Sequence, residues 1–294
     1  MDYVECLFID ATVSETDGQA RGPMPGVWHF TPRAGVARAA FLAQRGVTRF
    51  LVFGVPAAKG LDGATQAGAP VPQFLRAARE ALGDSVELIA DVGLSPYSLD
   101  GHSVVMDEHG RPDEMASYEA AGRLAVAFAQ AGADTVAPCL SLPRQVERIA
   151  AALRVAGFQT PVMPYSAKFS SAFYGPYRQA VRSGLGSSRK AYQTDYDDPA
   201  TALAQVVQDV AQGAAAVIVK PSMLYLDVLA QVCRTTSVPV AAYHVSGEYL
   251  ALMLAAEAGN MDRQALFDEY HSAVERCGAD LVIGYAGETF ISRG

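Results

Sequence analysis

Short runs of apolar, mostly β-branched residues recur along this 294-residue chain, and alanine-rich segments with helical periodicity lie between most of them. The apolar runs are roughly four to eight residues long, which is typical of strands buried on both faces. We therefore predict strands at residues 4–11, 48–55, 86–92, 134–137, 161–165, 215–219, 239–243 and 280–283.

The segments between these strands predict helices, and several of them end at a glycine shortly before the next strand, as at Gly132, Gly213 and Gly278. Glycine ends helices readily because it adopts the left-handed conformation without strain. Strands and helices that alternate over this length predict a (β/α)8 TIM barrel that forms a single domain over residues 1–294. The predicted helices include 71–82, 118–132, 143–157, 199–213 and 223–235.

An open doubly wound sheet is the alternative arrangement of the same elements. The positions of polar residues favour the barrel, because these residues cluster at the carboxyl ends of the predicted strands, which a closed barrel gathers around one mouth. No Gly-x-Gly-x-x-Gly or Walker motif follows a strand, so a nucleotide-binding sheet has little support. The polar residues at or just beyond strand ends are Asp91, Cys139, Lys168, Lys220, Ser246 and Tyr285.

Two of these residues are lysines, and each of them closes an apolar run. Burial and a second nearby cation both penalise the ammonium form, so a lysine pair in an apolar pocket offers a neutral amine that can attack a ketone. Lys168 and Lys220 therefore suggest Schiff-base chemistry on a carbonyl substrate. The alternative is that each lysine extends from its strand to solvent or holds a ligand anion.

The longest irregular segment, residues 173–198, is rich in Gly, Ser, Tyr and Arg. A loop of this length in a compact domain is usually functional or disordered. We interpret it as a lid over the active site. Its arginines, among them Arg178 and Arg189, present paired donors that match a carboxylate. The alternative interpretation is a solvated surface loop.

Charge and composition exclude several classes of partner. The net charge of −8 argues against nucleic acid and anionic membranes, which recruit proteins by an excess of lysine and arginine. No stretch approaches the roughly 20 apolar residues of a membrane span, and the N-terminus lacks the features of a signal peptide, so we expect a cytoplasmic protein. The four cysteines lie far apart and the five histidines form no helical pair, so the sequence offers no local metal site.

Longer motifs surround the two lysines and the predicted mouth. They are Tyr165-Ser166-Ala167-Lys168-Phe169, Phe173-Tyr174-Gly175-Pro176-Tyr177-Arg178, Val219-Lys220-Pro221 and Tyr243-His244-Val245-Ser246-Gly247-Glu248. In these motifs the chain resembles the porphobilinogen synthase family, also called δ-aminolevulinic acid dehydratase, and the resemblance runs from about Met24 to Tyr285. It implies the same barrel and a lyase of the hydro-lyase class, which condenses two molecules of 5-aminolevulinate to a pyrrole with loss of water.

The resemblance also implies roles for the lysines and their neighbours. Lys220 matches the lysine that forms the Schiff base with the first substrate. Lys168 matches the second lysine, which lowers the pKa of its neighbour or itself binds the other ketone. Asp91, Tyr174 and Tyr243 belong to the predicted substrate site, and Lys168, Tyr174 and Asp91 are candidates for the general acid or base.

Two carboxylate sites carry over in the same way. Ser246 and Tyr285 match the hydroxyl pair that holds the carboxylate of the first substrate. Arg178, Arg189 and Gln193 match the lid residues that hold the carboxylate of the second. The resemblance therefore implies that the partners of this chain are small keto acids.

The chain departs from the family at two places. Gly93, Ser95 and Ser103 stand where metal-dependent members carry cysteines or aspartates, so we expect neither a metal nor any other cofactor. Cys139 and Leu140 stand where the family carries a serine and an aspartate near the substrate amino groups. Loss of that carboxylate is expected to weaken or redirect the selection of an aminoketone.

The sequence leaves three hypotheses for the function. The first is a metal-independent, porphobilinogen synthase-like enzyme of tetrapyrrole biosynthesis. The second is a diverged member of specialised metabolism that joins 5-aminolevulinate or another γ-keto acid into a different product, and the third is a non-catalytic binder of keto acids. The N-terminal arm with which many members embrace a neighbouring subunit is missing, so we expect a homodimer or another small homo-oligomer.

Overall fold

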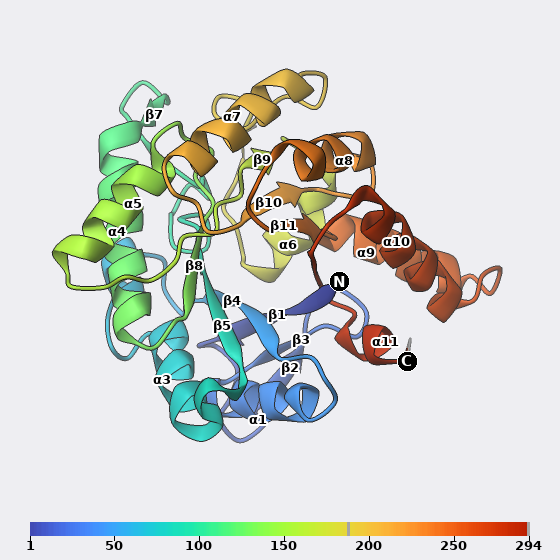
Figure 1. Cartoon of the computed structure of the whole chain (residues 1–294). Helices are drawn as coiled ribbons and strands as arrows, with labels where there is room; N and C mark the ends of the chain where they lie inside the picture. Colours follow the sequence, from blue (N-terminus) through green and yellow to red (C-terminus); the bar gives the residue numbers. More distant parts are fainter. Residues whose placement is uncertain (187–188, 293–294) are drawn as a thin grey trace.

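The computed structural model describes residues 1–186 and 189–292. Parallel strands follow one another in the order β8-β5-β4-β1-β12-β11-β10-β9 and curl into a barrel with helices around the outside (Figure 1). This is the (β/α)8 arrangement that the strand count predicts. The strands are β1 (Asp2–Asp10), β4 (Arg49–Val55), β5 (Glu87–Val92), β8 (Thr135–Pro138), β9 (Ala167–Lys168), β10 (Val217–Lys220), β11 (Val240–Tyr243) and β12 (Leu281–Gly284).

The segment 161–165 closes the barrel between β8 and β10. Val162 forms a bridge with Val136 of β8, and amides of β10 and the residues before it donate to carbonyls of the segment. In this part of the barrel, regular strand structure is confined to β9, which begins two residues after the segment ends. The prediction of a strand at 161–165 is therefore wrong in its bounds. The two prolines of the segment have no amide hydrogen to donate, which interrupts the ladder.

The five helices predicted from periodicity are found within four residues of their predicted bounds. The structure also contains the longer helices α1, α9 and α10, which are not among those five. Helix α9 is apolar around most of its circumference, so it lacks the polar face that marks a surface helix. The helices are α1 (Pro32–Ala43), α2 (Leu61–Ala64), α3 (Pro70–Leu82), α4 (Glu114–Gln130), α5 (Gln145–Val155), α6 (Gly175–Ala180), α7 (Pro199–Ala211), α8 (Leu226–Thr235), α9 (Ser246–Glu257), α10 (Arg263–Cys277) and α11 (Gly287–Ile291).

Smaller elements lie in the connections. Helix α6 and a 3-10 turn fall within or at the start of the 173–198 segment, so that segment is not irregular throughout. In the part of the chain that the structure describes, no helix is long and apolar enough to cross a membrane. The remaining elements are the hairpins β2 (Gln19–Arg21) with β3 (Trp28–Phe30) and β6 (Val105–Met106) with β7 (Pro112–Asp113), and the 3-10 turns Gly83–Ser85 and Ala172–Tyr174.

Capping residues fix where several helices begin. The side chains of Thr31, Asp113, Asp198 and Asp262 each accept a hydrogen bond from the backbone amide three residues further on. Such a cap satisfies one of the amides that a helix start leaves unpaired and contributes about 1 kcal/mol. The caps therefore set the lengths of the loops that precede α1, α4, α7 and α10.

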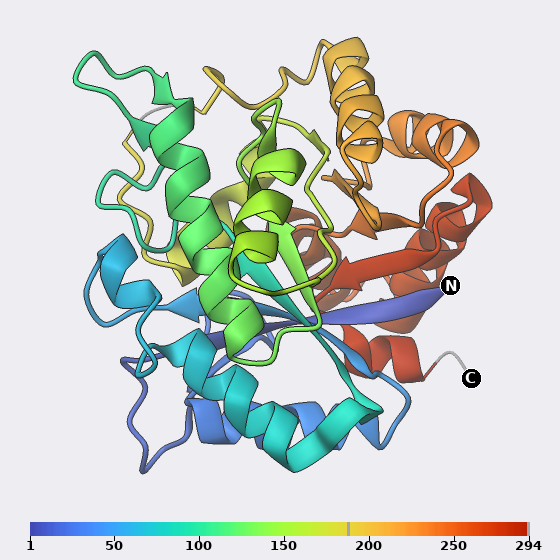
Figure 2. The same cartoon turned by 60° about the vertical axis from the view of Figure 1, so that its left-hand side comes forward.

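The core has two parts that share the strands. Along β1, Val4, Cys6 and Phe8 point into the barrel, while Leu7 and Ile9 pack outward against helices. Both faces of a strand are thus buried, which explains its unbroken apolar run. The start of β1 and helix α11 lie on the same side of the molecule (Figure 2).

Candidate active site

Strands β9 and β10 end in lysines, and their register pairs Lys168 with Lys220. Paired residues of adjacent parallel strands point to the same face, with the strands about 4.8 Å apart. The two residues are only 2% and 6% exposed. The structure therefore brings the predicted lysine pair together at the carboxyl mouth of the barrel, and the interpretation that the lysines extend to solvent is wrong.

The Lys220 amine lies among aromatic rings. Its Nζ is 4.0 Å from the ring centroid of Tyr243, 4.8 Å from that of Tyr165, and 5.4 Å from those of Tyr174 and Tyr177. These rings exclude water from the amine, although their faces also attract its charged form. Tyr165 and Tyr177 were not predicted as site residues, yet Tyr165 ends the apolar run 161–165 and so carries the same strand-end signal.

Burial is the largest influence on this amine, and it lowers the pKa of Lys220 to about 8. The positive charge of Lys168 lowers the pKa further, while Cys139 and Asp91 oppose the shift. A lysine with such a pKa supplies a substantial fraction of neutral amine near neutral pH.

Lys168 has a different environment. Its Nζ lies 3.1 Å from the backbone oxygen of Cys139 and 2.9 Å from the Sγ of the same residue. Burial lowers the pKa of Lys168, and the charge of Arg189 acts in the same direction, whereas Cys139 and Asp91 raise it. The two lysines therefore share a face but not a set of partners.

Asp91 lies at the end of β5 and is buried. The hydroxyl of Tyr165 donates to its Oδ1 over 2.8 Å. Burial raises the pKa of the Asp91 carboxyl, although Lys220, Tyr165 and Lys168 all favour its ionised form. Asp91 is therefore an acidic group within electrostatic reach of both lysines, and its role in substrate binding or proton transfer stays a prediction.

The predicted hydroxyl groups fall into two separate contacts. The hydroxyls of Tyr243 and Tyr285 lie 3.2 Å apart. Ser246 donates to the carbonyl of Phe173 over 3.2 Å and accepts from the amide of Tyr177 over 3.0 Å. Ser246 thus connects the start of α9 to the beginning of the 173–198 segment.

The hydroxyl of Tyr174 is occupied by hydrogen bonds to backbone carbonyls at the ends of the strands. Its hydroxyl lies 2.7 Å from the carbonyl of Phe169 and 3.2 Å from that of Lys220. Burial raises the pKa of Tyr174 well above its ordinary value. In this arrangement Tyr174 contacts Lys220 through its ring and through the backbone, and its role as a general acid or base stays a prediction.

The predicted lid residues carry buried polar atoms that lack partners. Arg189 donates to the carbonyl of Gly101 over 2.6 Å. Within residues 1–186 and 189–292, the Nε atoms of Arg178 and Arg189 and both amide atoms of Gln193 are buried without a hydrogen bond. Burial and the charge of Arg189 lower the pKa of Arg178. Unpaired buried donors are costly, so the guanidinium groups of Arg178 and Arg189 and the Nε2 of Gln193 are suited to an anion.

Comparison with known proteins agrees with this site. The family model described as delta-aminolevulinic acid dehydratase matches residues 1–292. This chain belongs to the delta-aminolevulinic acid dehydratase family. The delta-aminolevulinic acid dehydratase of Mycobacterium tuberculosis (strain H37Rv) is 40% identical over 268 residues, which cover 89% of this chain and 81% of that protein. That of Escherichia coli (strain K12) is 34% identical over 288 residues, which cover 97% and 87%.

Solved structures agree as well. The delta-aminolevulinic acid dehydratase of Toxoplasma gondii ME49, in complex with the reaction product porphobilinogen, superposes with a TM-score of 0.94 at 30% identity and covers 99% of this chain and 84% of that chain. A dihydropteroate synthase of Xanthomonas albilineans, with a TM-score of 0.54 at 13% identity, shares the fold alone. The predicted family, TIM barrel and hydro-lyase class are therefore confirmed.

The residues at the family's metal positions do not fit a zinc site. A Cβ added to Gly93 would lie 2.6 Å from Oδ2 of Asp91, so a cysteine there requires that carboxylate to move. Ser95 and Ser103 supply hydroxyls in place of the thiolate and imidazole ligands that zinc prefers. Across the described parts of the chain, no three His, Cys, Asp or Glu side chains are grouped so that they could hold a metal ion.

Glu248 is a buried acidic residue beside the site that the sequence analysis does not name among the candidate site residues. It is fully buried, and its two carboxylate oxygens accept from the amides of Met223, over 2.8 Å, and Val245, over 2.9 Å. Burial raises the pKa of Glu248 to about 7. The carboxylate thus joins the loop after Lys220 to the loop before Ser246. A glutamate at the third position of a helix is a capping signal that marks this residue in the sequence.

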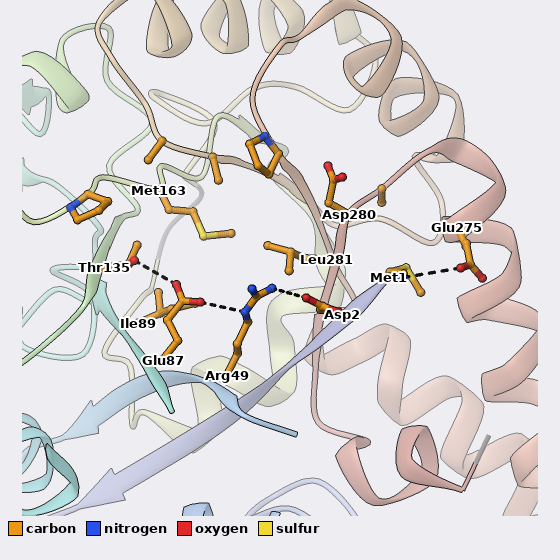
Figure 3. Close-up of a pocket in the computed structure, with 15 residues that line it drawn as sticks. Met1, Asp2, Arg49, Glu87, Ile89, Thr135, Met163, Glu275, Asp280 and Leu281 are labelled. Carbon is orange, nitrogen blue, oxygen red and sulfur yellow. Dashed lines mark hydrogen bonds and ion pairs between the residues drawn. The ribbon is translucent and has the colours of Figure 1, made fainter. Parts of the chain in front are cut away.

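A cavity of about 590 Å³ lies at the opposite end of the barrel (Figure 3). Arg49 spans it, with its guanidinium 2.8 Å from Asp2 and 2.9 Å from Glu87. The amino ends of the strands line this cavity, and that end of a TIM barrel serves stability rather than chemistry. The lysine pair at the carboxyl ends is therefore the candidate active site.

Proposed function

We propose that this chain is a porphobilinogen synthase that condenses two molecules of 5-aminolevulinate, and that Lys220 forms the Schiff base with the first. The buried pairing of Lys220 with Lys168 carries the proposal. The neutral Lys220 amine adds to the ketone carbon, the carbonyl oxygen is protonated and leaves as water, and an imine to Lys220 remains. Its protonated form activates the adjacent carbon for bond formation.

We assign the proton transfers next to this imine to the titratable groups near it, Asp91 and Lys168. Asp91 lies within electrostatic reach of both lysines, and burial raises its pKa toward the range of a general acid. Lys168 supplies the neighbouring ammonium. The tyrosine rings around Lys220 keep these transfers away from bulk water.

The carboxylate of the first substrate is assigned to the hydroxyls of Tyr285 and Ser246. Tyr243 supports this assignment, since its hydroxyl contacts that of Tyr285 while its ring lies against the Lys220 amine. A keto acid with its carbonyl at Lys220 would therefore reach the hydroxyls of Tyr243 and Tyr285, whereas Ser246 would have to turn its hydroxyl away from the carbonyl of Phe173 to donate to the same carboxylate.

The carboxylate of the second substrate is assigned to Arg178, Arg189 and Gln193. Their buried polar atoms without partners support the assignment, because a carboxylate would satisfy donors that are otherwise costly to bury. The described parts of segment 173–198, which leave out residues 187 and 188, then act as a lid that contacts the Lys220 amine through the rings of Tyr174 and Tyr177.

The reaction is proposed to proceed without a metal. The support is the donor chemistry at Gly93, Ser95 and Ser103, which supplies no thiolate, imidazole or carboxylate ligand. If this is right, prolonged dialysis against a chelator leaves kcat/KM unchanged. Loss of activity that returns with added Zn²⁺ or Mg²⁺ would overturn this part of the proposal.

One observation favours a second candidate, the enzyme that forms a different product. Leu140 is fully buried and Cys139 lies against Lys168, where the family has a serine and an aspartate. No carboxylate from position 140 can then meet a substrate ammonium. The comparisons with named relatives nevertheless favour porphobilinogen.

The test is borohydride reduction with 5-aminolevulinate, followed by intact-mass measurement and peptide mapping, with product analysis in an unreduced sample. We expect one adduct on Lys220 and formation of porphobilinogen, and Lys59 and Lys190 serve as internal controls that stay unlabelled. An adduct with a different product would establish the second candidate. Absence of any adduct would overturn the Schiff-base mechanism.

A further inference from the structure

The segment 173–198 turns sharply where helix α6 ends, and the residue at that turn is Arg182. The amide of Arg182 donates to the carbonyl of Gln179 over 3.1 Å, and the amide of Ser183 donates to that of Arg178 over 2.8 Å. These two hydrogen bonds form the Schellman motif that ends many helices. The turn residue of this motif adopts the left-handed conformation, and Arg182 does so with a φ of 51°.

An arginine at this turn is unusual. Glycine is the common residue of the motif, because a side chain in the left-handed region lies too close to the backbone. A strained conformation persists only where the surrounding contacts hold it, and such positions cluster at functional sites. The contacts of the Arg182 side chain therefore indicate what the arginine contributes in place of glycine.

The side chain of Arg182 extends to the end of β1. Its Nη2 atom lies 3.0 Å from Oδ2 of Asp10 and also donates to the hydroxyl of Thr12. Asp10 is the last residue of β1 and is only 2% exposed, and Nδ1 of His29 lies 2.9 Å from the same oxygen. Burial raises the pKa of Asp10, but the hydrogen bonds of His29 and Thr12 and the charge of Arg182 lower it overall. Asp10 is therefore an ionised and fixed partner for the arginine.

A second contact holds the residue before Arg182. The amine of Lys59, in the loop after β4, donates to the carbonyl of Val181 over 2.9 Å and to that of Pro96 over 2.5 Å. Residues 181 and 182 are thus attached to the loops that follow β1, β4 and β5 at the mouth of the barrel. The contact of Val181 uses the backbone and is open to any residue, whereas the contact with Asp10 requires the Arg182 side chain.

Arg178, which is assigned to the second carboxylate, belongs to the same turn, since its carbonyl accepts from the amide of Ser183. We propose that Arg182 is a positioning residue: its contact with Asp10 holds the end of α6 against β1 and so places the Arg178 guanidinium for the carboxylate of the second substrate. The inference rests on the proposed function and deepens it, because it adds to that carboxylate site a residue that does not itself touch the substrate.

The effect of this contact is expected on binding rather than on stability. The side chain of Arg182 is 49% exposed, and ion pairs with an exposed partner contribute little to the free energy of unfolding. Glycine at position 182 would lose the ion pair but would also lose the backbone strain. Position matters more, because displacing a binding group by about 1 Å can cost up to about a hundredfold in rate.

The experiment compares Arg182→Gly, Arg182→Ala and Arg182→Lys with the wild type. Each preparation is characterised by kcat and KM with 5-aminolevulinate, by the free energy of unfolding in denaturant, and by the rate at which cyanoborohydride traps levulinate on Lys220. Levulinate is the same γ-keto acid without the amino group, and one molecule of it on Lys220 reports on the first site alone. Arg111→Ala is the matched control, because it removes another arginine–aspartate pair, that with Asp107.

We expect kcat/KM of Arg182→Gly and Arg182→Ala to fall by about tenfold, mainly through a higher KM, because the Arg178 guanidinium is no longer held in place. Trapping of levulinate on Lys220 should change little. The two variants should differ in stability, since alanine keeps the strain that glycine removes. Arg182→Lys keeps a cation for Asp10 and is expected to recover part of the loss, and Arg111→Ala should match the wild type in kcat/KM.

The outcomes separate this inference from the proposed function. A merely structural role of Arg182 would lower activity only together with stability, so a loss of kcat/KM in a fully stable Arg182→Gly supports positioning. Unchanged kcat/KM in that variant, or equal losses of turnover and trapping, overturns the inference while the Schiff base on Lys220 stands. Absence of both adduct and porphobilinogen in the wild type overturns both. If Arg182→Ala does not fold, as circular dichroism would show, the comparison passes to Arg182→Asn, which tolerates the left-handed conformation.

Discussion

Lys168 and Lys220 are direct partners in the register of β9 and β10. No spacing in the sequence brings them together, because the pairing arises only when the barrel closes around the segment 161–165. Once they are paired and buried at the mouth of the barrel, the positive charge of each lysine disfavours the charged form of the other. The reactivity of Lys220 is thus a property of the pair.

Replacing Lys168 by methionine is predicted to raise the pKa of Lys220, so that its reaction with a ketone requires a higher pH. The substitution keeps the volume and removes the cation that lowers the pKa of Lys220, so this pKa rises above about 8. Since only the neutral amine reacts, the rate of reductive trapping with levulinate falls by about three- to tenfold at pH 7 and recovers at high pH. The measurement is this rate as a function of pH.

Lys168→Arg provides the comparison, because it restores a cation at the same position. Its trapping profile is expected to stay closer to that of the wild type than the methionine variant does. Identical profiles for wild type and Lys168→Met would show that the pair is not electrostatically coupled.

Arg189→Met is predicted to weaken binding of the second substrate. A buried charge-assisted hydrogen bond to a carboxylate is worth about 1.5–3 kcal/mol, so kcat/KM should fall by roughly ten- to a hundredfold. Trapping of a single levulinate on Lys220 should change much less, since this ligand occupies the first site. Steady-state kinetics and trapping are measured on the same preparation.

The control for this variant is Arg123→Ala. Arg123 is an exposed arginine that pairs with Asp62 on the outside of the barrel, and its loss should leave kcat/KM unchanged. If Arg189→Met instead lowered trapping and turnover equally, Arg189 would not be specific to the second carboxylate.

The sequence predicts much of the framework for physical reasons. A strand buried on both faces has to be apolar throughout, so the runs that become β1, β4, β5 and β10 are visible without the structure. The lysines that end β9 and β10 are visible too, because a charged residue directly after such a run lies at a strand end. The family motifs around them then indicate the chemistry.

Contacts between distant segments could not be predicted in this way. The hydrogen bonds of Lys168 to Cys139, and that of Tyr165 to Asp91, join residues far apart in the chain and depend on the closed barrel. The regular strand at 161–165 was wrong because the prolines that fit its apolar pattern also remove amide donors. Glu248 has a local capping signal, but its contact with Met223 is again tertiary.

Glu248→Gln is predicted to change how stability depends on pH. Folding raises the pKa of Glu248 from 4.5 to about 7, so its contribution to stability is fully present below pH 4.5 and is lost as the pH rises through 7. A shift of this size corresponds to about 3 kcal/mol. Glutamine does not titrate, so the free energy of unfolding of wild type minus variant should decrease by up to that amount between pH 4.5 and 8.

Denaturant unfolding at several pH values in this range tests this prediction. Glu5 and Asp209 also have raised pKa values, about 8 and about 6, but they are present in both proteins and cancel in the difference. A difference between wild type and variant that does not depend on pH would contradict the assignment of the raised pKa to Glu248.

Arg49→Met is predicted to lower stability slightly without affecting catalysis. Arg49 holds Asp2 and Glu87 together across the amino-terminal cavity (Figure 3), and all three side chains are partly exposed to solvent. Exposed ion pairs contribute about 0–1 kcal/mol each, so the Tm should fall by about 2 °C, and by less in 1 M salt, which screens the charges. Because the lysine pair lies at the other end of the barrel, kcat/KM and trapping on Lys220 should match the wild type. A large loss of kcat/KM in the folded variant would mean that this end of the barrel is coupled to the reaction.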